Sequence, residues 1–130
     1  MSMTGKEPMI LTARRGRAAL RMTCVPMGRD LSVTLCGGRA HIGAVAVSQA
    51  RPSLEPDGGT SATTSVIALP GHKEDELARA IAARFAARLD AVVTVACGIH
   101  LDGIRPEELK DVQDLAEQLS AEALGRLTAP

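Results

Sequence analysis

The segment Ala91–Cys97 constrains the fold of this chain most, because it is an apolar run without alternation, broken only by Thr94. Such a run is typical of a strand that is buried on both faces of a sheet. It directly follows His72–Leu89, in which apolar residues recur every four positions and acidic residues crowd the beginning. This pattern predicts a helix, since the spacing forms one apolar face and acidic groups suit the positive end of the helix dipole. A helix that leads into a buried strand therefore organises the expected domain.

The remaining patterns predict further strands before this helix and a second helix after the buried strand. Alternating apolar and polar residues have a strand period at Met9 to about Val25, Leu31–Cys36, His41–Val47 and Ala62–Leu69. The intervening Ser48–Ser61 holds two prolines and a glycine pair, which predicts a flexible loop. An apolar stripe predicts the last helix at roughly Pro106–Leu124, with proline in its first turn.

From this order of elements we expect a single α+β domain over residues 9–130, preceded by a loose tail at residues 1–8. Its sheet would be mixed and mainly antiparallel, with about five or six strands and two helices packed on one face. The other face of that sheet, if left bare, would be covered by another copy. We therefore predict a homo-oligomer.

Composition excludes several classes of function. The 15 basic and 15 acidic residues cancel, whereas a nucleic-acid binder needs a surplus of Lys and Arg. Phe85 is the only aromatic residue, so base-stacking platforms and aromatic cages are not expected. No segment is long and apolar enough for a transmembrane helix, and Met1–Pro8 lacks the apolar core of a secretory signal. Three widely spaced cysteines without a CxxC pair favour buried, reduced thiols in a cytoplasmic protein.

The three histidines, His41, His72 and His100, each lie next to glycine-containing segments at the end of a predicted element. The strands ending at Leu69 and Cys97 are joined through a helix, which predicts that they run parallel and end at the same edge of the sheet. If the strand that begins at His41 runs antiparallel to both, its start lies at that edge too. Ligands of open α/β sheets bind at such an edge, so we expect the histidines to line one site there.

Three chemical readings of this edge stay open from the residues alone. Each histidine could be a turn or capping residue held by local hydrogen bonds. A transition metal could be bound by His41, His72 and His100 with Asp102 or Glu74, although no diagnostic spacing supports it. A phosphate could be bound by backbone amides at Gly71–Glu74 with Lys73 and Arg39, although the acidic first turn weakens that reading. No familiar nucleotide-binding motif is present.

Three short segments, Gly37–Ala44, Leu69–Glu74 and Gly98–Asp102, resemble the recurrent segments of the small LpdD-type proteins, in the same order. Those proteins accompany prenylated-flavin decarboxylases of the gallate, or hydroxyarylic acid, type. The resemblance extends over most of the chain from Arg17 to Leu124.

The resemblance implies a non-catalytic accessory protein that binds reduced prenylated flavin mononucleotide (FMN) and helps to deliver it to the large UbiD-type decarboxylase subunit. It places the site at His41, His72, Glu74, His100 and Asp102, with glycines shaping the pocket and aliphatic residues such as Ile42, Ile99 and Leu101 forming its walls. The candidate cofactor-binding residues are thus Gly37, Gly38, Arg39, His41, Gly43, Gly71, His72, Lys73, Glu74, Gly98, His100 and Asp102. The alternatives are a small metal-dependent hydrolase or lyase that uses the three histidines, and a purely structural subunit.

Overall fold

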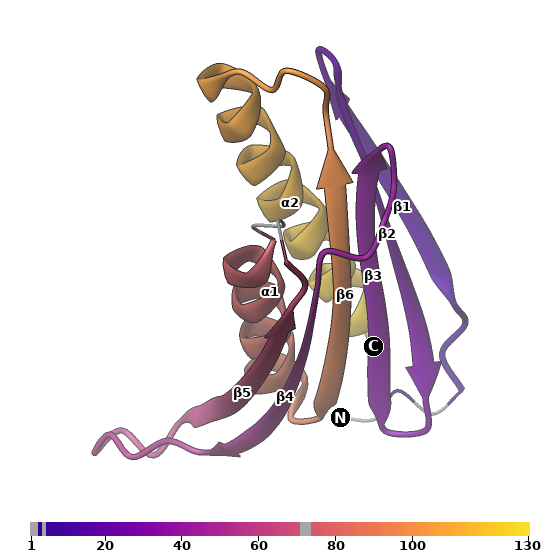
Figure 1. Cartoon of the computed structure of the whole chain (residues 1–130). Coiled ribbons are helices and arrows are strands. Elements are labelled where there is room, and N and C mark those ends of the chain that lie inside the picture. Colours follow the sequence, from indigo (N-terminus) through magenta and orange to yellow (C-terminus); the bar gives the residue numbers. More distant parts are fainter. Residues whose placement is uncertain (1–2, 4, 71–73) are drawn as a thin grey trace.

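The computed structural model of the chain describes residues 3, 5–70 and 74–130. Along the chain, five strands are followed by a helix, a sixth strand and a final helix. Figure 1 shows how these elements are arranged. They are β1 (Met9–Arg15), β2 (Ala18–Met27), β3 (Asp30–Gly38), β4 (Ala44–Pro52), β5 (Thr60–Ala68), α1 (Asp75–Leu89), β6 (Val92–His100) and α2 (Pro106–Leu127). The α+β class, the number of strands and the two helices are as the sequence predicts.

The six strands form one sheet in the order β1-β2-β3-β6-β4-β5. β6 pairs in parallel with β3 and antiparallel with β4, which itself pairs antiparallel with β5. The strand after His41 is therefore antiparallel to both β5 and β6, as the site prediction requires. It also lies between them, so β5 and β6 run in the same direction without pairing. The ends of β3, β5 and β6 and the start of β4 consequently meet at one edge of the sheet.

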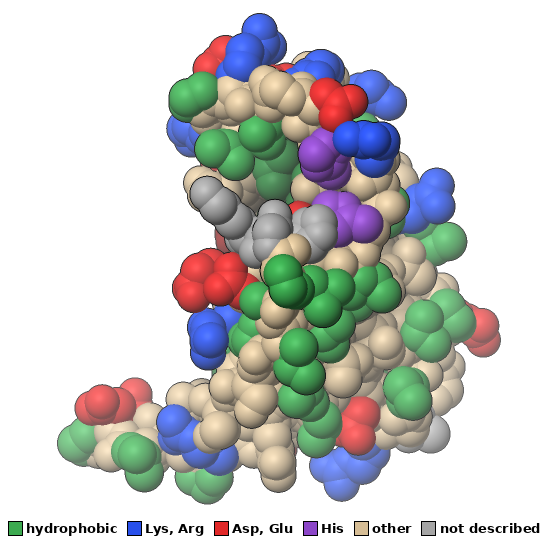
Figure 2. Space-filling view, viewed as in Figure 1, with side chains coloured by type: hydrophobic (Ala, Val, Ile, Leu, Met, Phe, Trp, Pro, Cys, Tyr) green, Lys and Arg blue, Asp and Glu red, His purple; other side chains and the backbone are tan. Residues whose placement is uncertain are grey.

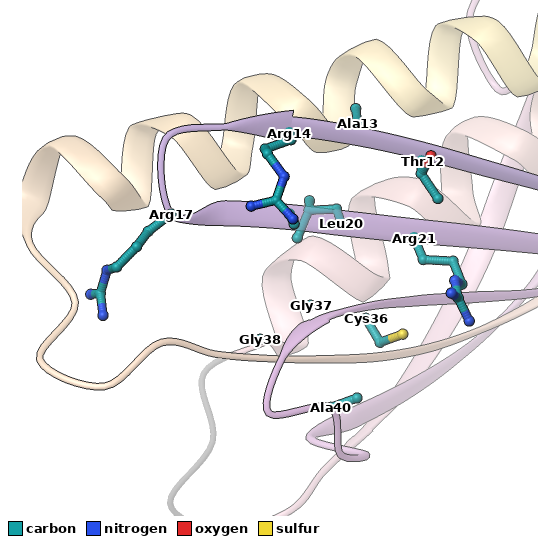
Figure 3. A pocket seen from close by; sticks show the side chains of 11 residues that line it. Thr12, Ala13, Arg14, Arg17, Leu20, Arg21, Cys36, Gly37, Gly38 and Ala40 are labelled. Carbon is teal, nitrogen blue, oxygen red and sulfur yellow. The ribbon is translucent and has the colours of Figure 1, made fainter.

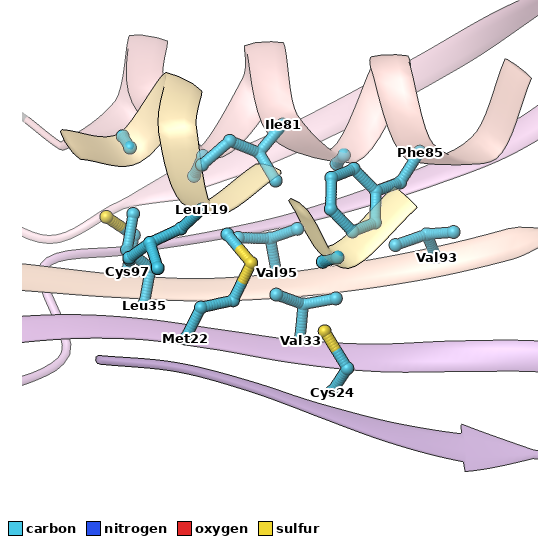
Figure 4. Close-up of a cluster of buried hydrophobic side chains, with 14 of the residues drawn as sticks. Met22, Cys24, Val33, Leu35, Ile81, Phe85, Val93, Val95, Cys97 and Leu119 are labelled. Carbon is cyan, nitrogen blue, oxygen red and sulfur yellow. The ribbon is translucent and has the colours of Figure 1, made fainter. Parts of the chain in front are cut away.

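Both helices cover the same face of the sheet, α1 over β4, β5 and β6 and α2 over β1 and β2 (Figure 1). Alternation along the strands turns one set of side chains toward the helices, and these are buried. Figure 4 shows the centre of this core, where Phe85 and Ile81 of α1 and Leu119 of α2 meet the side chains of β2, β3 and β6. The buried strand residues there are Met22, Cys24, Val33, Leu35, Val93, Val95 and Cys97.

Two boundary predictions are wrong. The segment from Met9 to about Val25 is a hairpin of two strands, and it reverses at Gly16, whose φ of +59° glycine adopts without strain. Two of its residues, Arg15 and Ala18, pair across the turn. The expected loop Ser48–Ser61 is loop only over residues 53–59, because β4 continues to Pro52 and β5 begins at Thr60. In each case polar residues that support strand pairing concealed where the strands begin and end.

The helices begin and end at recognisable signals. α2 starts after Arg105 with a proline at its first position, and the Glu108 carboxylate accepts a hydrogen bond from the Arg105 amide. α1 ends at Leu89, and the residue that caps it, Asp90, adopts the left-handed conformation at φ +52°. Within the segment 1–8 that we expected to be loose, Met3 is fully buried in the core and its carbonyl accepts a hydrogen bond from Lys6. None of the helices in the described part of the chain could cross a membrane.

Candidate functional site

The edge where β3 and β6 end gathers most of the described candidate residues. Gly38 and His100 are register partners, and the amide of Arg39 donates to the carbonyl of His100 at 3.0 Å. The chain then crosses to the start of β4, where the Gly43 amide donates to the Cys97 carbonyl at 2.9 Å. Residues 39–43 are thereby fixed against the end of β6 at both of their ends. We call residues 39–43 the crossing loop.

Two glycines permit this close approach. A Cβ atom on Gly98 would collide with the carbonyl oxygen of His41, and one on Gly43 would collide with the carboxylate of Glu74. Both glycines are buried, and the collision at Gly98 is with backbone, whereas the one at Gly43 is with the end of a side chain. Glycine at these two positions is what lets the crossing loop and the first residue of the α1 region lie directly on β6.

The crossing loop carries His41 into contact with the beginning of α1. His41 Nε2 lies 3.1 Å from Glu74 Oε1, and its Nδ1 lies 3.2 Å from the carbonyl oxygen of Arg39. An oxygen acceptor therefore faces each ring nitrogen. The Nε2 contact is an ion pair whenever the imidazole is protonated, and the side chains of His41 and Glu74 are then 23% and 11% exposed.

Glu74 does more than complement the helix dipole. Its side chain makes no capping bond to α1, and its Oε1 instead accepts a hydrogen bond from the Ile99 amide at 3.2 Å. The other oxygen, Oε2, is buried and has no hydrogen-bond partner among the described residues. A buried carboxylate oxygen without a donor is costly, so it is suited to accept a hydrogen bond from a ligand.

The second histidine belongs to a more exposed cluster. His100 Nε2 lies 2.8 Å from Asp102 Oδ1 and 2.9 Å from Arg39 Nη2, and Arg39 Nη2 donates to the same Asp102 oxygen at 2.8 Å. With its proton on Nε2 the ring donates to Asp102, and with its proton on Nδ1 it accepts from Arg39. The hydrogen bond from His100, followed by the charge of Arg39, lowers the pKa of Asp102. The His41 and His100 rings meet edge to face, with centroids 6.4 Å apart.

A pocket of about 540 Å³ opens beside these two histidines, between the start of α1, the end of β6 and the start of α2. Figure 2 shows the histidines with acidic and basic side chains next to them and hydrophobic side chains nearby. Most of the wall is aliphatic, and the polar groups are confined to a few positions, as in small-molecule sites. The lining residues are His41, Glu74, Glu76, Leu77, Ala80, Ile99, His100, Leu101, Ile104, Leu109, Val112 and Gln113.

The sequence did not reveal the α2 side of this pocket. Ile104 is 38% exposed and Leu109 is 51% exposed, although both are large and apolar. Leu109 belongs to the apolar stripe of α2, which continues past the sheet and so reaches beyond the core. The signal in the sequence was that the apolar stripe of α2 is longer than the surface on which this helix packs. Conversely Ile42, expected as a wall, does not line the pocket and is 57% exposed.

Other predicted site residues lie apart from the pocket or outside the described chain. Gly37 and Gly38 line a second, open hollow of about 780 Å³ on the helix-free face, with Arg14 and Arg21 beside it (Figure 3). The predicted residues Gly71, His72 and Lys73 lie outside the described residues. The structure therefore brings His41 and His100 to one site, as the single-site prediction requires. The third histidine, His72, lies outside the described residues, so its place at this site stays a prediction.

The turn that leads from His100 into α2 is clamped by Arg17. Its guanidinium donates to both oxygens of the buried Glu108 carboxylate, at 2.7 and 2.9 Å, and to the Asp102 carbonyl at 2.8 Å. The Arg17 hydrogen bond lowers the pKa of Glu108 from 4.5 to about 2. This paired carboxylate fixes the start of α2, and with it Leu109, against the β1–β2 turn.

Glu108 should make stability pH-dependent in acid. Because its folded-state pKa is depressed, its contribution is complete above about pH 4.5 and is lost as pH falls toward 2. Urea unfolding followed by circular dichroism should give Glu108→Gln a flatter profile than the wild type across this window. Glu117→Gln, whose carboxylate is 69% exposed, should keep the wild-type profile. Equal slopes for all three proteins would contradict the assignment.

The other reactive groups of the described chain offer less. Within residues 3, 5–70 and 74–130, no three His, Cys, Asp or Glu side chains are grouped to hold a metal ion. Burial raises the pKa of the Cys24 thiol to about 11 and that of Cys97 to about 12, so these are poor nucleophiles at neutral pH. Cys36 is a free, half-buried thiol at the helix-free face.

The fold and the site together define a small two-layer α+β domain with a preformed, mostly aliphatic pocket that is polar at one end. Such a geometry is suited to hold a small ligand. The chain belongs to the family described as the prenylated flavin chaperone LpdD-like domain, whose model matches residues 14–128.

The chain is also similar to a solved structure described as the crystal structure of a novel chaperone complex for yeast 20S proteasome assembly. The sequence identity is 14% and the TM-score 0.49, and the match covers 88% of this chain and 97% of that chain. No curated protein matched the sequence.

Proposed function

We propose that this protein binds reduced prenylated FMN in the 540 Å³ pocket and delivers it to a UbiD-type hydroxyarylic acid decarboxylase, without catalysing a reaction of its own. The observation that carries the proposal is the pocket's division into an aliphatic wall and a polar end, where a buried oxygen of Glu74 accepts no hydrogen bond from residues 3, 5–70 and 74–130. A prenylated flavin has the same division, since its ring system and prenyl carbons are apolar and its ring edge and phosphate are polar.

The charges favour one orientation of such a ligand. Glu74 and Glu76 line the α1 side of the pocket, where they would repel a phosphate. Arg39 does not itself line the pocket, but its Nη2 lies 2.9 Å from Nε2 of His100, which does. The phosphate is therefore expected at Arg39 and His100, the ring edge with its N–H group at Glu74, and the prenylated rings on the wall of Leu77, Ile99, Ile104 and Leu109.

The Arg39 ion pair suits a protein that must both take up and release its ligand. Arg39 and Asp102 are each 74% exposed, so their pairing is weak and exchangeable. A phosphate would replace the Asp102 carboxylate as the partner of Arg39, and Asp102 would return when the ligand leaves. Arg39 would thus have an anionic partner in either state.

The direct test is anaerobic incubation with reduced prenylated FMN, rapid desalting, and native mass spectrometry with absorbance. The protein has no Trp or Tyr, so absorbance above 300 nm would report the ligand alone. About one retained cofactor per chain, followed by activation of an apo-decarboxylase on mixing, is the expected result. Empty protein with intact cofactor in the flow-through would overturn binding, and retention without activation would overturn delivery.

Leu109→Gln should weaken retention by roughly tenfold, because a buried leucine contributes about 1.5–3 kcal/mol and each 1.4 kcal/mol is tenfold in affinity. Leu109 is already 51% exposed without ligand, so folding should be unaffected. The matched control is Leu54→Gln on the β4–β5 turn, where the side chain is 90% exposed and far from the pocket lining. Dissociation constants from anaerobic titration would separate the two variants, and equal affinities would exclude this wall.

A further inference from the structure

The face of the sheet opposite the helices carries side chains unlike those of an ordinary solvated surface. Register places them in rows across the sheet, one of which runs Ile10–Thr23–Thr34–Ala96–Val45–Ile67. The next row runs Val25–Ser32–Thr94–Val47–Ser65. Neither row contains a charged residue. These two rows are called the central rows.

Charge is rare on this face although the chain is rich in it elsewhere. Arg14, Arg21 and Arg51 are its basic residues, and Asp30, which accepts a hydrogen bond from the Val92 amide, lies at its border. Lysine and glutamate, common on solvated surfaces, are absent from the strand positions of this face in the described chain. Retention of arginine with loss of lysine and acidic residues is the composition of the buried part of protein–protein interfaces.

Large apolar side chains gather on the same face without cover. Among the exposed large hydrophobic residues, Ile10, Val25, Val45, Val47 and Ile67 belong to the central rows, and Ile67 is 70% exposed. Figure 2 shows hydrophobic side chains clustered below the histidines on the side turned toward the viewer. A contiguous patch of this kind is typical of a binding surface rather than of a free one.

The face has the size that a stable dimer needs. Six strands spaced about 4.8 Å apart span about 24 Å, and nine residues at about 3.3 Å each extend about 30 Å, which gives about 700 Å². A standard interface buries about 800 Å² on each partner. One sheet of the same dimensions would therefore cover this face.

We propose that two copies of this chain stack their helix-free sheet faces, so that the central rows form the middle of a homodimer interface. The occupant is a second copy because the centre is neutral and mixes hydroxyl groups with aliphatic ones, so it is compatible with itself. An acidic partner would be drawn to Arg14 and Arg21 at the β1–β2 margin, and it would leave the aliphatic and hydroxyl side chains of β4 and β5 in the central rows without a complement. Face-to-face packing of sheets about 10 Å apart supplies the geometry.

Sedimentation velocity and size-exclusion chromatography with light scattering test this directly on the full chain. The wild type should have twice the 13.6 kDa chain mass at micromolar concentration. Thr34→Arg and Val47→Arg, made separately, should each shift the protein to the monomer, because charge would be placed in the centre of the interface. Both side chains are exposed in the single chain, so each variant should keep the wild-type circular dichroism spectrum. Gln118→Arg, exposed on α2, is the matched control and should stay dimeric.

Three results would overturn the proposal. A wild-type mass of 13.6 kDa across this concentration range would show that the free protein is a monomer. The proposal would then be wrong even if the same face binds a decarboxylase. Folded Thr34→Arg and Val47→Arg variants that stay dimeric would place the interface elsewhere. Dissociation by Gln118→Arg would place it on the helical side. No flavin is present in these measurements, so their outcome is independent of cofactor binding.

Discussion

Gly98→Ala should abolish retention of the flavin and lower the free energy of unfolding by about 1–3 kcal/mol, the usual cost of overpacking a filled site. The added methyl group would collide with the carbonyl of His41, whose backbone belongs to the crossing loop. Relief requires the loop to leave the end of β6, which would carry His41 away from Glu74. A single carbon atom would thus dismantle the polar end of the pocket.

The matched control for this substitution is Gly125→Ala on α2. A Cβ atom there has no other atom within 4 Å, and alanine in a helix is favoured over glycine by about 0.5–1 kcal/mol. This variant should therefore gain stability and retain the cofactor normally. Urea unfolding and anaerobic retention measured on both proteins decide the matter. Normal retention by Gly98→Ala would mean that the crossing loop does not set the geometry of the site.

Phe85→Ala should remove about 3–5 kcal/mol of stability, because it leaves a large cavity at the centre of the core. Phe85 is fully buried, and Figure 4 shows it between α1 and the strands, near Val33 and Val93. Domains of this kind have about 5–15 kcal/mol in total, so the variant should be partly unfolded or close to it at 37 °C.

Arg88→Ala in the last turn of the same helix is the control, and it should change stability by less than about 0.5 kcal/mol because the side chain is exposed. Far-UV circular dichroism is the appropriate probe, since the chain lacks Trp and Tyr. A loss below 1 kcal/mol for Phe85→Ala would mean that α1 rests on the sheet without a specific core.

The sequence predicts this fold well wherever periodicity is unambiguous. The recurrence of apolar residues every four positions in α1 fits one structure, a helix packed on a sheet. The continuous apolar run of β6 likewise fits one structure, a strand in the interior of that sheet. Turns were harder, because the reversal at Gly16 needs only two residues and interrupts no pattern. The expected loop after Ser48 was too long at both ends for a related reason, since serine and threonine are tolerated by loops and by edge strands such as β5.

The candidate site was predictable in its polar half and hidden in its apolar half. Topology alone brings His41 to His100, because an antiparallel β4 must begin where β6 ends. The pairing of His41 with Glu74 depends on side-chain reach across a glycine, and one sequence does not encode that distance visibly. From the sequence alone, Ile104 and Leu109 look like ordinary core residues. The structure shows that the sheet ends before it reaches them, so they form a wall of the pocket.

The strand order also sets a sequence of events during biosynthesis. The β1–β2–β3 meander and the β4–β5 hairpin each pair with neighbours in the chain, and they are joined into one sheet by β6 alone. Until β6 has been made, no strand can join these two groups, and the edges of β3 and β4 that face β6 stay bare. Only when the ribosome has passed His100 can Leu31 find Val93 and the halves unite. The interval before that moment, when β3 and β4 both lack their partner, is when this protein most needs protection from aggregation.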